Sequence, residues 1–497
     1  MTQLRQLAGQ TAIYGTSTIF GRLLNYALVP FYTYIFGNPA DFGLNTEFYA
    51  YISFLNILFA YGMETALFNF SSSEQNKELV YSTSLRSLLV SSILLSLPVV
   101  FFAGQIAETL RYPGHADFVR WAILIVATDA LTAIPFARLR EQNKARRFAT
   151  IKLLNIIINL AINFFFIGWC KWEYENNTGS ALAELYDPSI GIGYAFIANL
   201  AANVFTLMLL SPELTKIRYG FDAALWKRMM RYSLPLLVVG FAGMTNETLD
   251  RILIKYLLPP GIGEEQLGIY GACYKISILM TIFIQAFRYA AEPFFFSRRE
   301  EEGAPALYGK IMKYFVVFCL LIFIGTSLNL SWIQLLVGEE YRSGIAVVPI
   351  LLLANLFLGM YFNLSIWYKL TGRTRFGMWL TLVGAAITLV LNFRWIPSAH
   401  PVFGGYMGSA WATLICYGTM MILSYIIGQR YYRVKYDVPR ILGYIALAVL
   451  LFLAGKFIAV TGKYWLDLLL NNLLVFAYFL IVVLAEKPFR QVVKHPR

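Results

Sequence analysis

The segment from Gly344 to Lys369 reads GIAVVPILLLANLFLGMYFNLSIWYK and contains no charged residue before its last position. A run of about 20 apolar residues is long enough for a helix to cross roughly 30 Å of hydrocarbon. Lipid offers no hydrogen-bond partner to the backbone, so a spanning segment is either a helix or a strand of a closed barrel. This run is too long and too continuous for a barrel strand, so it predicts a transmembrane helix.

Similar runs recur along the whole chain, which has 497 residues, 58% of them hydrophobic and only 14% charged. The sequence therefore predicts an all-α integral membrane protein with about 14 transmembrane helices. The expected spans are residues 11–36, 43–70, 83–105, 116–139, 149–170, 189–212, 232–258, 267–297, 310–336, 344–369, 375–396, 404–428, 440–461 and 465–486.

The distribution of basic residues between the loops predicts the orientation of these spans. If the spans alternate in direction, the loops on the side of the N-terminus hold nearly all of the loop arginines and lysines. The opposite loops hold only Arg111, Lys171, Arg342, Arg394 and Lys463. Loops rich in arginine and lysine stay in the cytoplasm, so we expect both termini there. The same bias accounts for the net charge of +13 without nucleic-acid binding.

Pairs of similar motifs indicate an internal repeat. Phe42-Gly43 begins the second span as Leu267-Gly268 begins the eighth, and Gly193-Tyr194 begins the sixth as Gly405-Tyr406 begins the twelfth. Spans one to six and seven to twelve therefore look like two copies of one six-helix unit in the same orientation. Such parallel repeats are typical of transporters that work by alternating access around a central cavity.

The repeat predicts four parts of the chain. Residues 1–214 form an N-terminal six-helix lobe, and residues 215–231 form a basic, amphipathic cytoplasmic linker that lies on the membrane surface. Residues 232–430 form a C-terminal six-helix lobe, and residues 431–497 form an extra helix pair and a cytoplasmic tail.

Two glycine-containing motifs resemble those of a known family. Residues 267–276 (LGIYGACYKI) are similar to the start of the eighth helix of bacterial polysaccharide flippases, which carry O-antigen or capsule repeat units, and residues 405–413 (GYMGSAWAT) resemble their twelfth helix. Lipid II flippases and the MATE multidrug antiporters belong to the same superfamily. The resemblance implies that the chain moves an undecaprenyl-diphosphate-linked oligosaccharide from the inner to the outer leaflet of the bacterial inner membrane, for lipopolysaccharide or capsule synthesis. It also implies a monomer without a cofactor, with a polysaccharide polymerase and chain-length machinery as partners.

Basic residues within the spans are the candidates for binding a diphosphate. Charges at the middle of a span are costly and usually face a cavity or a partner. An arginine can bind two phosphate oxygens at once. The expected substrate-binding residues are Arg22, Arg251 and Arg288, together with Lys275, Tyr26 and Gln285.

Two helical patterns bear on these assignments. Glu247, Arg251 and Lys255 follow one another at intervals of four residues, a spacing that favours ion pairs within one helix as an alternative to ligand binding. At 100° per residue, Arg288 shares a face with Gln285 and Glu292, whereas Lys275 points elsewhere on an unkinked helix.

Acidic residues at membrane depth are candidates for binding a coupling ion. They are Asp129, Glu64 and Asp250. For Asp129 and Glu64, pairing with Arg22 or Arg288 is the alternative explanation, because intramembrane charges commonly pair with one another. A stripe of Asn155, Asn159 and Asn163 predicts hydrogen bonds between helices in preference to contacts with sugar.

The remaining residues argue against an enzyme or a metal protein. No histidine lies in a span, the four cysteines are far apart, and no loop is long enough to form a domain outside the membrane. Two transport alternatives stay open. A MATE-like, cation-coupled drug antiporter would favour an acidic or aromatic cavity. A lipid II flippase resembles the chain as well, but that family has basic residues in its second helix, where this chain has Glu47 and Glu64.

Overall fold

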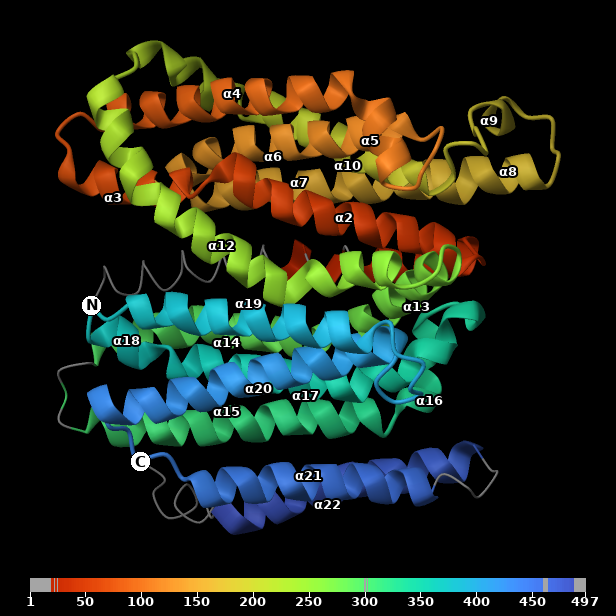
Figure 1. The fold of residues 1–497 in the computed structure, drawn as a ribbon, viewed down its shortest axis with the longest axis vertical. Helices are drawn as coiled ribbons and strands as arrows, with labels where there is room; N and C mark the ends of the chain where they lie inside the picture. Colours follow the sequence, from red (N-terminus) through yellow and green to blue (C-terminus); the bar gives the residue numbers. More distant parts are fainter. Residues whose placement is uncertain are drawn as a thin grey trace. The chain divides into compact units, whose positions relative to one another are not determined.

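The computed structural model describes residues 19–21, 23–24, 26–298, 301, 303–458 and 464–486. Within these residues all regular secondary structure is helical, which confirms the all-α prediction. The chain forms two compact units, residues 1–268 and residues 269–497. The helix α13 (Ile262–Ile276) begins in the first unit and ends in the second (Figure 1).

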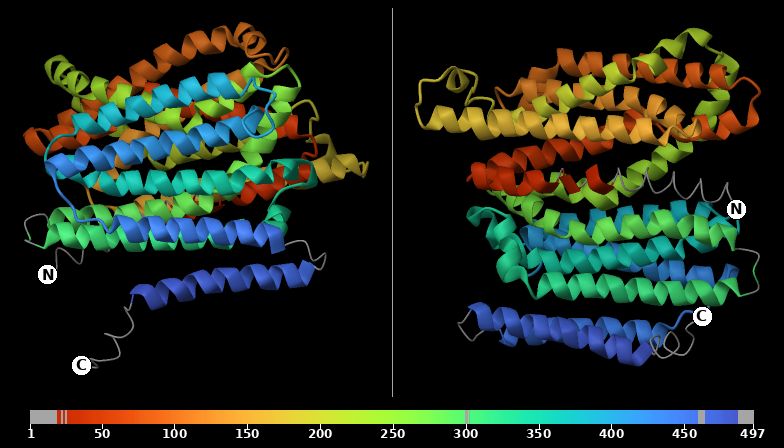
Figure 2. Two further views of the ribbon diagram at one scale, coloured as in Figure 1. Left: turned by 60° about the horizontal axis from the view of Figure 1, so that its bottom comes forward. Right: turned by 180° about the vertical axis from the view of Figure 1, so that it is seen from behind.

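The first unit contains the elements from α2 to α12 (Figure 1). Its long helices are α2 (Pro39–Ala60), α4 (Lys77–Phe101), α6 (Ala116–Glu141), α7 (Ala145–Asn163), α10 (Tyr194–Leu209) and α12 (Ala223–Leu257). Its short helices are α3 (Met63–Ser73), α5 (Ala103–Thr109), α8 (Lys171–Glu175), α9 (Ala181–Glu184) and α11 (Ser211–Leu214). A π-helical segment, Phe164–Cys170, joins α7 to α8, and both α8 and α9 extend past the ends of the neighbouring helices of this unit (Figure 2).

Helix α6 lies in the core of the first unit. It packs against α2, α3, α4, α5, α7 and α10. Its buried apolar residues include Val119, Ile123 and Val126, which pack with Phe48 of α2 and Phe196 of α10. Buried residues occur on every side of the helix from Ile134 to Leu139, in agreement with its central position.

Two glycines of the repeat motifs lie against each other in the first unit. A Cβ atom on Gly268 would lie 1.8 Å from the carbonyl oxygen of Pro39 and 3.0 Å from the backbone nitrogen of Gly43. A Cβ atom on Gly43 would lie 2.3 Å from the carbonyl oxygen of Glu264. The backbones of α2 and α13 therefore approach so closely that only glycine fits at these two positions.

The second unit contains the remaining helices. They are α14 (Ile278–Ser297), α15 (Ala304–Ser327), α16 (Leu330–Ile333), α17 (Val347–Leu364), α18 (Ile366–Leu370), α19 (Arg375–Trp395), α20 (Gly405–Tyr431), α21 (Val438–Ile458) and α22 (Tyr464–Glu486). Helix α17 packs against α14, α15 and α20 and is largely buried.

Polar contacts at the end of α22 and near its middle hold it against α15 and the residues that follow α15. At the end, the Lys313 ammonium of α15 bonds to the Glu486 carboxylate of α22. Near the middle, Asn472 of α22 donates a hydrogen bond to Asn329, which follows α15, over 3.1 Å. Figure 2 shows α21 and α22 side by side. The C-terminal pair is thus part of the second unit.

Among the described residues, 11 helices are long and apolar enough to cross a membrane, or up to 12 if α13 and α14, which are bent by 46° at their junction, form one span. These helices match the predicted spans two to six and eight to fourteen. Of the predicted first span, residues 11–18, 22 and 25 lie outside the described residues, and the described residues up to Ile35 are helical. Helix α12 matches the seventh span but does not count among the 11. The chain is thus a multi-pass membrane protein, and the total of 14 stays a prediction.

The segment between the two repeats is held on the first unit. Ser82 and Arg86 of α4 donate hydrogen bonds to the carbonyl oxygen of Ile217, over 2.6 and 3.0 Å. Residues 223–231 of the expected surface linker form the first turns of α12. Helix α12 itself belongs to the first compact unit, although the repeat assigns it to the second lobe. The lobe boundaries stay a prediction.

Candidate functional site

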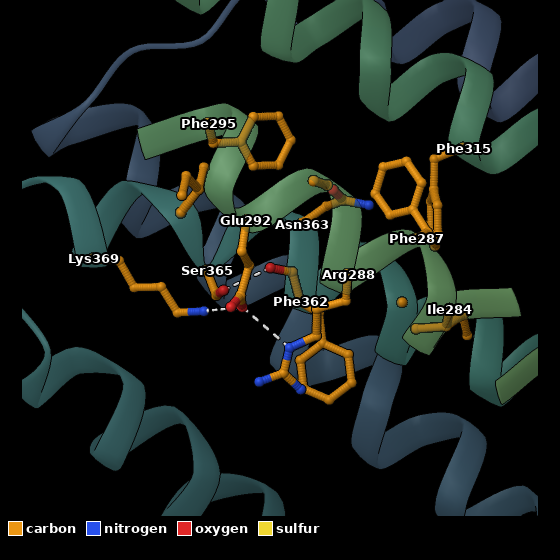
Figure 3. A pocket seen from close by; sticks show the side chains of 13 residues that line it. Ile284, Phe287, Arg288, Glu292, Phe295, Phe315, Phe362, Asn363, Ser365 and Lys369 are labelled. Atoms are coloured by element: carbon orange, nitrogen blue, oxygen red, sulfur yellow. Dashed lines mark hydrogen bonds and ion pairs between the residues drawn. The ribbon is translucent and has the colours of Figure 1, made fainter. Parts of the chain in front are cut away.

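A pocket in the second unit is lined by α14, α15, α17 and α18 and combines aromatic rings with charged side chains (Figure 3). The charged residues that line it are Arg288 and Glu292 of α14 and Lys369 of α18. The aromatic residues are Phe287 and Phe295 of α14, Phe315 of α15 and Phe362 of α17. The pocket therefore offers both an apolar wall and an ionic site.

One carboxylate oxygen holds both cations of this pocket. The Oε1 atom of Glu292 accepts a hydrogen bond from Arg288 Nε over 3.1 Å and another from Lys369 Nζ over 2.5 Å (Figure 3). The side chains are 45% exposed for Arg288, 36% for Glu292 and 27% for Lys369. Two positive charges thus face one negative charge, and all three side chains are partly exposed to solvent.

Local sequence explains part of this arrangement. Arg288 and Glu292 are four residues apart on one helix, so their side chains lie on the same face. The Arg288 guanidinium lies 4.7 Å from the centre of the Phe362 ring, a distance at which a cation is attracted to an aromatic face. Lys369 comes from a helix distant in the sequence, and the sequence analysis placed it only at the end of a predicted span.

The other predicted ligands of the second unit do not line this pocket. Gln285 is half-buried on α14, one turn before Arg288, and Lys275 is exposed on α13. The bend between α13 and α14 means that angles counted along a straight helix do not relate Lys275 to Arg288.

The structure corrects the expected ion pairs of α12. Arg251 donates a hydrogen bond to the backbone carbonyl of Glu247 over 2.8 Å, and its guanidinium lies 4.0 Å from the buried Asp250 carboxylate. Lys255 does not continue the expected intrahelical series, because its ammonium bonds to Glu47 of α2 over 2.8 Å. Helix spacing predicted which side chains share a face of α12, but not that a neighbouring helix supplies a better partner.

The pair formed by Glu47 and Lys255 is the centre of a buried polar network. Both side chains are 0% exposed. The Glu47 carboxylate also accepts hydrogen bonds from the hydroxyl groups of Tyr51 and Tyr112, each over 2.6 Å. Lys255 donates a second hydrogen bond to the carbonyl oxygen of Leu110 over 2.7 Å. The sequence did not predict that Glu47 and Lys255 form a pair.

Asp129 lies in a second polar cluster of the first unit. Its carboxylate accepts hydrogen bonds from Asn203 of α10, over 2.8 Å, and from Asn56 of α2. Lys152 of α7 is close enough to attract it electrostatically. Asn56 also lines a cavity of about 380 Å³ that continues along Ser53 of α2 and residues of α12. Asp129 is thus half-buried and hydrogen-bonded to a residue that lines this cavity.

The asparagine stripe of α7 forms contacts between helices, as predicted. Asn155 donates hydrogen bonds to Asn203 and Thr206 of α10, over 3.2 and 3.0 Å. Asn163 accepts a hydrogen bond from the Tyr32 hydroxyl over 2.6 Å.

The other acidic and N-terminal candidates have different surroundings. Glu64 of α3 forms an ion pair with Arg140 of α6, a partner that the sequence did not predict. Tyr26 is half-buried in the helical residues that precede α2. Arg22 lies outside the described residues.

The described residues contain no group of three or more histidine, cysteine, aspartate or glutamate side chains that could hold a metal ion. The four cysteines are buried and unpaired with one another.

Comparison with known proteins identifies the family. Residues 7–298 match the family described as "Polysaccharide biosynthesis protein". No curated protein matches the chain significantly.

Two groups of solved structures share the fold. A structure described as "Lipid II flippase MurJ, inward closed conformation" has 13% sequence identity and a TM-score of 0.70, and the match covers 95% of this chain and 99% of that one. An inward-facing multidrug resistance transporter of the MATE family, from the MOP superfamily, has 13% identity and a TM-score of 0.58, with 82% and 94% covered. A MATE structure in complex with MaD3S has 14% identity and a TM-score of 0.59, with 85% and 95% covered. The chain therefore belongs to the polysaccharide biosynthesis protein family and has the fold of MOP-superfamily flippases and transporters.

Proposed function

We propose that this protein is a flippase that moves undecaprenyl-diphosphate-linked oligosaccharide repeat units from the inner to the outer leaflet of a bacterial inner membrane, for O-antigen or another surface polysaccharide. Membership of the polysaccharide biosynthesis family supports a role in this process. One observation carries the proposal of an anionic cargo. The pocket on α14 and α18 brings Arg288 and Lys369 to the same carboxylate, which leaves one surplus positive charge among the residues that line it.

The residue roles follow from the chemistry of such a cargo. Arg288 binds the diphosphate from the cytoplasmic side, because a guanidinium forms strong, charge-assisted hydrogen bonds to phosphate oxygens. The aromatic residues Phe287 and Phe362 line the pocket beside this contact. Arg22, Arg251, Lys275, Tyr26 and Gln285 are proposed as further contacts to the cargo.

Transport in this proposal proceeds by alternating access with both termini in the cytoplasm. The protein acts as a monomer, and it delivers the repeat unit to the polymerase and chain-length machinery. No covalent bond of the cargo is broken, so catalysis is no part of the proposal.

Asp129 is the proposed coupling-ion residue. Its hydrogen-bond partner Asn56 lines a cavity, which supports access of an ion or a proton to this carboxylate. Asp250 is a second candidate, because it is buried on α12. Glu64 is a weaker one, because Arg140 already neutralises it.

A lipid II flippase is the second candidate function. It is supported by the likeness to the MurJ structure over 95% of this chain. Both cargoes are lipid diphosphates, so the same basic pocket suits either one. The MATE-like alternative is less well supported, since a surplus positive charge repels the cations that a cation-coupled drug antiporter of this kind would carry.

The test is deletion of the gene in its host. We expect loss of surface polysaccharide on gels and accumulation of undecaprenyl-linked oligosaccharide on the inner leaflet. Complementation with Arg288→Ala should fail to restore the polymer, while Arg298→Ala should restore it. Arg298 pairs with Glu301 at the end of the same helix but does not line the pocket, so it is a matched control. Unchanged polysaccharide after deletion would reject the proposal, and rescue of a strain that lacks its lipid II flippase would favour the second candidate.

A further inference from the structure

In the pocket on α14 and α18, the carboxylate of Glu292 lies between two basic side chains. A bound anionic ligand would be expected in the same place. Glu292 Oε1 receives both Arg288 Nε and Lys369 Nζ. An oxygen that accepts hydrogen bonds from an arginine and a lysine at once has the surroundings of a bound phosphate oxygen. A role restricted to joining α14 to α18 would need only one of the two cations.

The geometry also allows another anion to replace the Glu292 carboxylate. Arg288 uses its Nε atom toward Glu292, while its two terminal nitrogens point away from the carboxylate (Figure 3). All three charged side chains are partly exposed, between 27% and 45%. Ion pairs at this exposure are weak, because water screens them, and a competing anion can therefore displace the carboxylate.

The depth of the pocket agrees with the headgroup of a lipid. Glu292 lies five residues before the end of α14 at Ser297, which is about 8 Å along the helix axis. The basic residues that follow α14 mark the predicted cytoplasmic side. The pocket is therefore expected close to the inner surface, where the diphosphate of a lipid-linked cargo lies.

We propose that Glu292 is an exchangeable anion that occupies the phosphate position between Arg288 and Lys369 in the empty state. This inference rests on the proposed function, and it adds Lys369 as a substrate-binding residue and Glu292 as a residue that regulates binding. An incoming diphosphate takes over both cations, and Glu292 turns away. The displaced carboxylate stays nearby and repels the bound anion, which speeds release. The ligand class is a diphosphate, either on a lipid or in solution.

The experiment measures binding to the full-length protein in lipid nanodiscs. The two probes are inorganic pyrophosphate and undecaprenyl diphosphate incorporated in the nanodisc, the second detected by its competition with labelled pyrophosphate. Each variant is first checked for its thermal unfolding temperature, so that a misfolded protein is recognised.

Removing the acid should strengthen pyrophosphate binding, whereas removing either base should weaken it. Glu292→Gln should bind pyrophosphate about two- to fivefold more tightly, which is the effect of removing one partly exposed ion pair. Arg288→Ala and Lys369→Met should bind about tenfold more weakly, because each loses a charged hydrogen bond. Lys369→Arg, which keeps the positive charge, should bind pyrophosphate about as tightly as the wild type. Glu301→Gln, which removes an exposed pair with Arg298 outside the pocket, should leave binding unchanged.

Weaker binding in Glu292→Gln would overturn the proposal, because it would mean that the carboxylate only positions the two cations. Equal binding in all variants would also overturn it. If undecaprenyl diphosphate competes with labelled pyrophosphate, the ligand is a lipid diphosphate. If pyrophosphate binds but undecaprenyl diphosphate does not compete, the lipid is rejected and the site is assigned to soluble diphosphates. These binding results do not depend on the sugar, so unchanged polysaccharide after gene deletion would reject the proposed function without affecting them.

Discussion

Removal of Lys255 should destabilise the protein strongly, and restoring neutrality at Glu47 should reverse part of the loss. Lys255 and Glu47 are both fully buried and lie 2.8 Å apart on α12 and α2. Lys255→Met leaves a carboxylate without its cation in surroundings that exclude water. It also leaves the carbonyl oxygen of Leu110 without the hydrogen bond that Lys255 donates.

The magnitude follows from the burial of both partners. Breaking a buried ion pair by removing one partner costs about 3–5 kcal/mol of unfolding free energy. The hydroxyl groups of Tyr51 and Tyr112 still donate to Glu47, so we expect a value near the lower end of this range. In the double variant Glu47→Gln/Lys255→Met the buried charge is gone, and the amide oxygen still accepts a hydrogen bond from a tyrosine. The double variant should therefore lie within about 1–2 kcal/mol of the wild type, the cost of the imperfectly satisfied polar groups.

The assay is equilibrium unfolding of the purified full-length protein in mixed detergent micelles, followed by tryptophan fluorescence. Arg120→Met is the matched control, because Arg120 and its partner Asp117 are 47% and 63% exposed and the loss of their pair should cost less than about 1 kcal/mol. A cost for Lys255→Met no larger than that of the control would refute the reasoning. So would a double variant that is as unstable as the single one.

Two further predictions concern the first unit. Gly268→Ala should destabilise the protein by about 1–3 kcal/mol, because the new methyl group would meet the carbonyl oxygen of Pro39 and the backbone cannot yield as a side chain can. Gly243→Ala on α12, where nothing lies within 4 Å, should instead be neutral or stabilise by up to about 1 kcal/mol in the same unfolding assay. Asp129→Asn should abolish the dependence of transport on an ion gradient in proteoliposomes while the protein stays folded. Gradient dependence retained by this variant would remove Asp129 from the coupling mechanism and leave its attraction to Lys152 as a purely structural contact.

The membrane class and most of the span positions were predictable from the sequence. Long apolar runs are a local property, because each helix satisfies its own backbone in lipid whatever its neighbours are. The described helices therefore match the predicted spans from the second to the sixth and from the eighth to the fourteenth. The family was also recognisable, because its glycine motifs are short and continuous. Gly43 and Gly268 stand out in the repeat, and the structure gives the reason in the contact between their backbones.

The site was predictable only in part. The sequence identified Arg288 as a candidate ligand and Glu292 as its neighbour on one helical face, since side chains four residues apart meet on any helix. It did not identify Lys369, because nothing local distinguishes a lysine that turns into a pocket from one that only marks a cytoplasmic loop.

The partners of the buried charges were decided by the tertiary structure alone. Within α12, the spacing of Glu247, Arg251 and Lys255 favours pairs along the helix, yet Lys255 bonds to Glu47, 208 residues away. Glu64 likewise pairs with Arg140, 76 residues away, which the sequence did not predict. Hydropathy and helical period depend on neighbours along the chain, so they fix where helices form and which face is polar. The choice of partner depends on which faces of distant helices meet, and that is set by the packing of the whole unit.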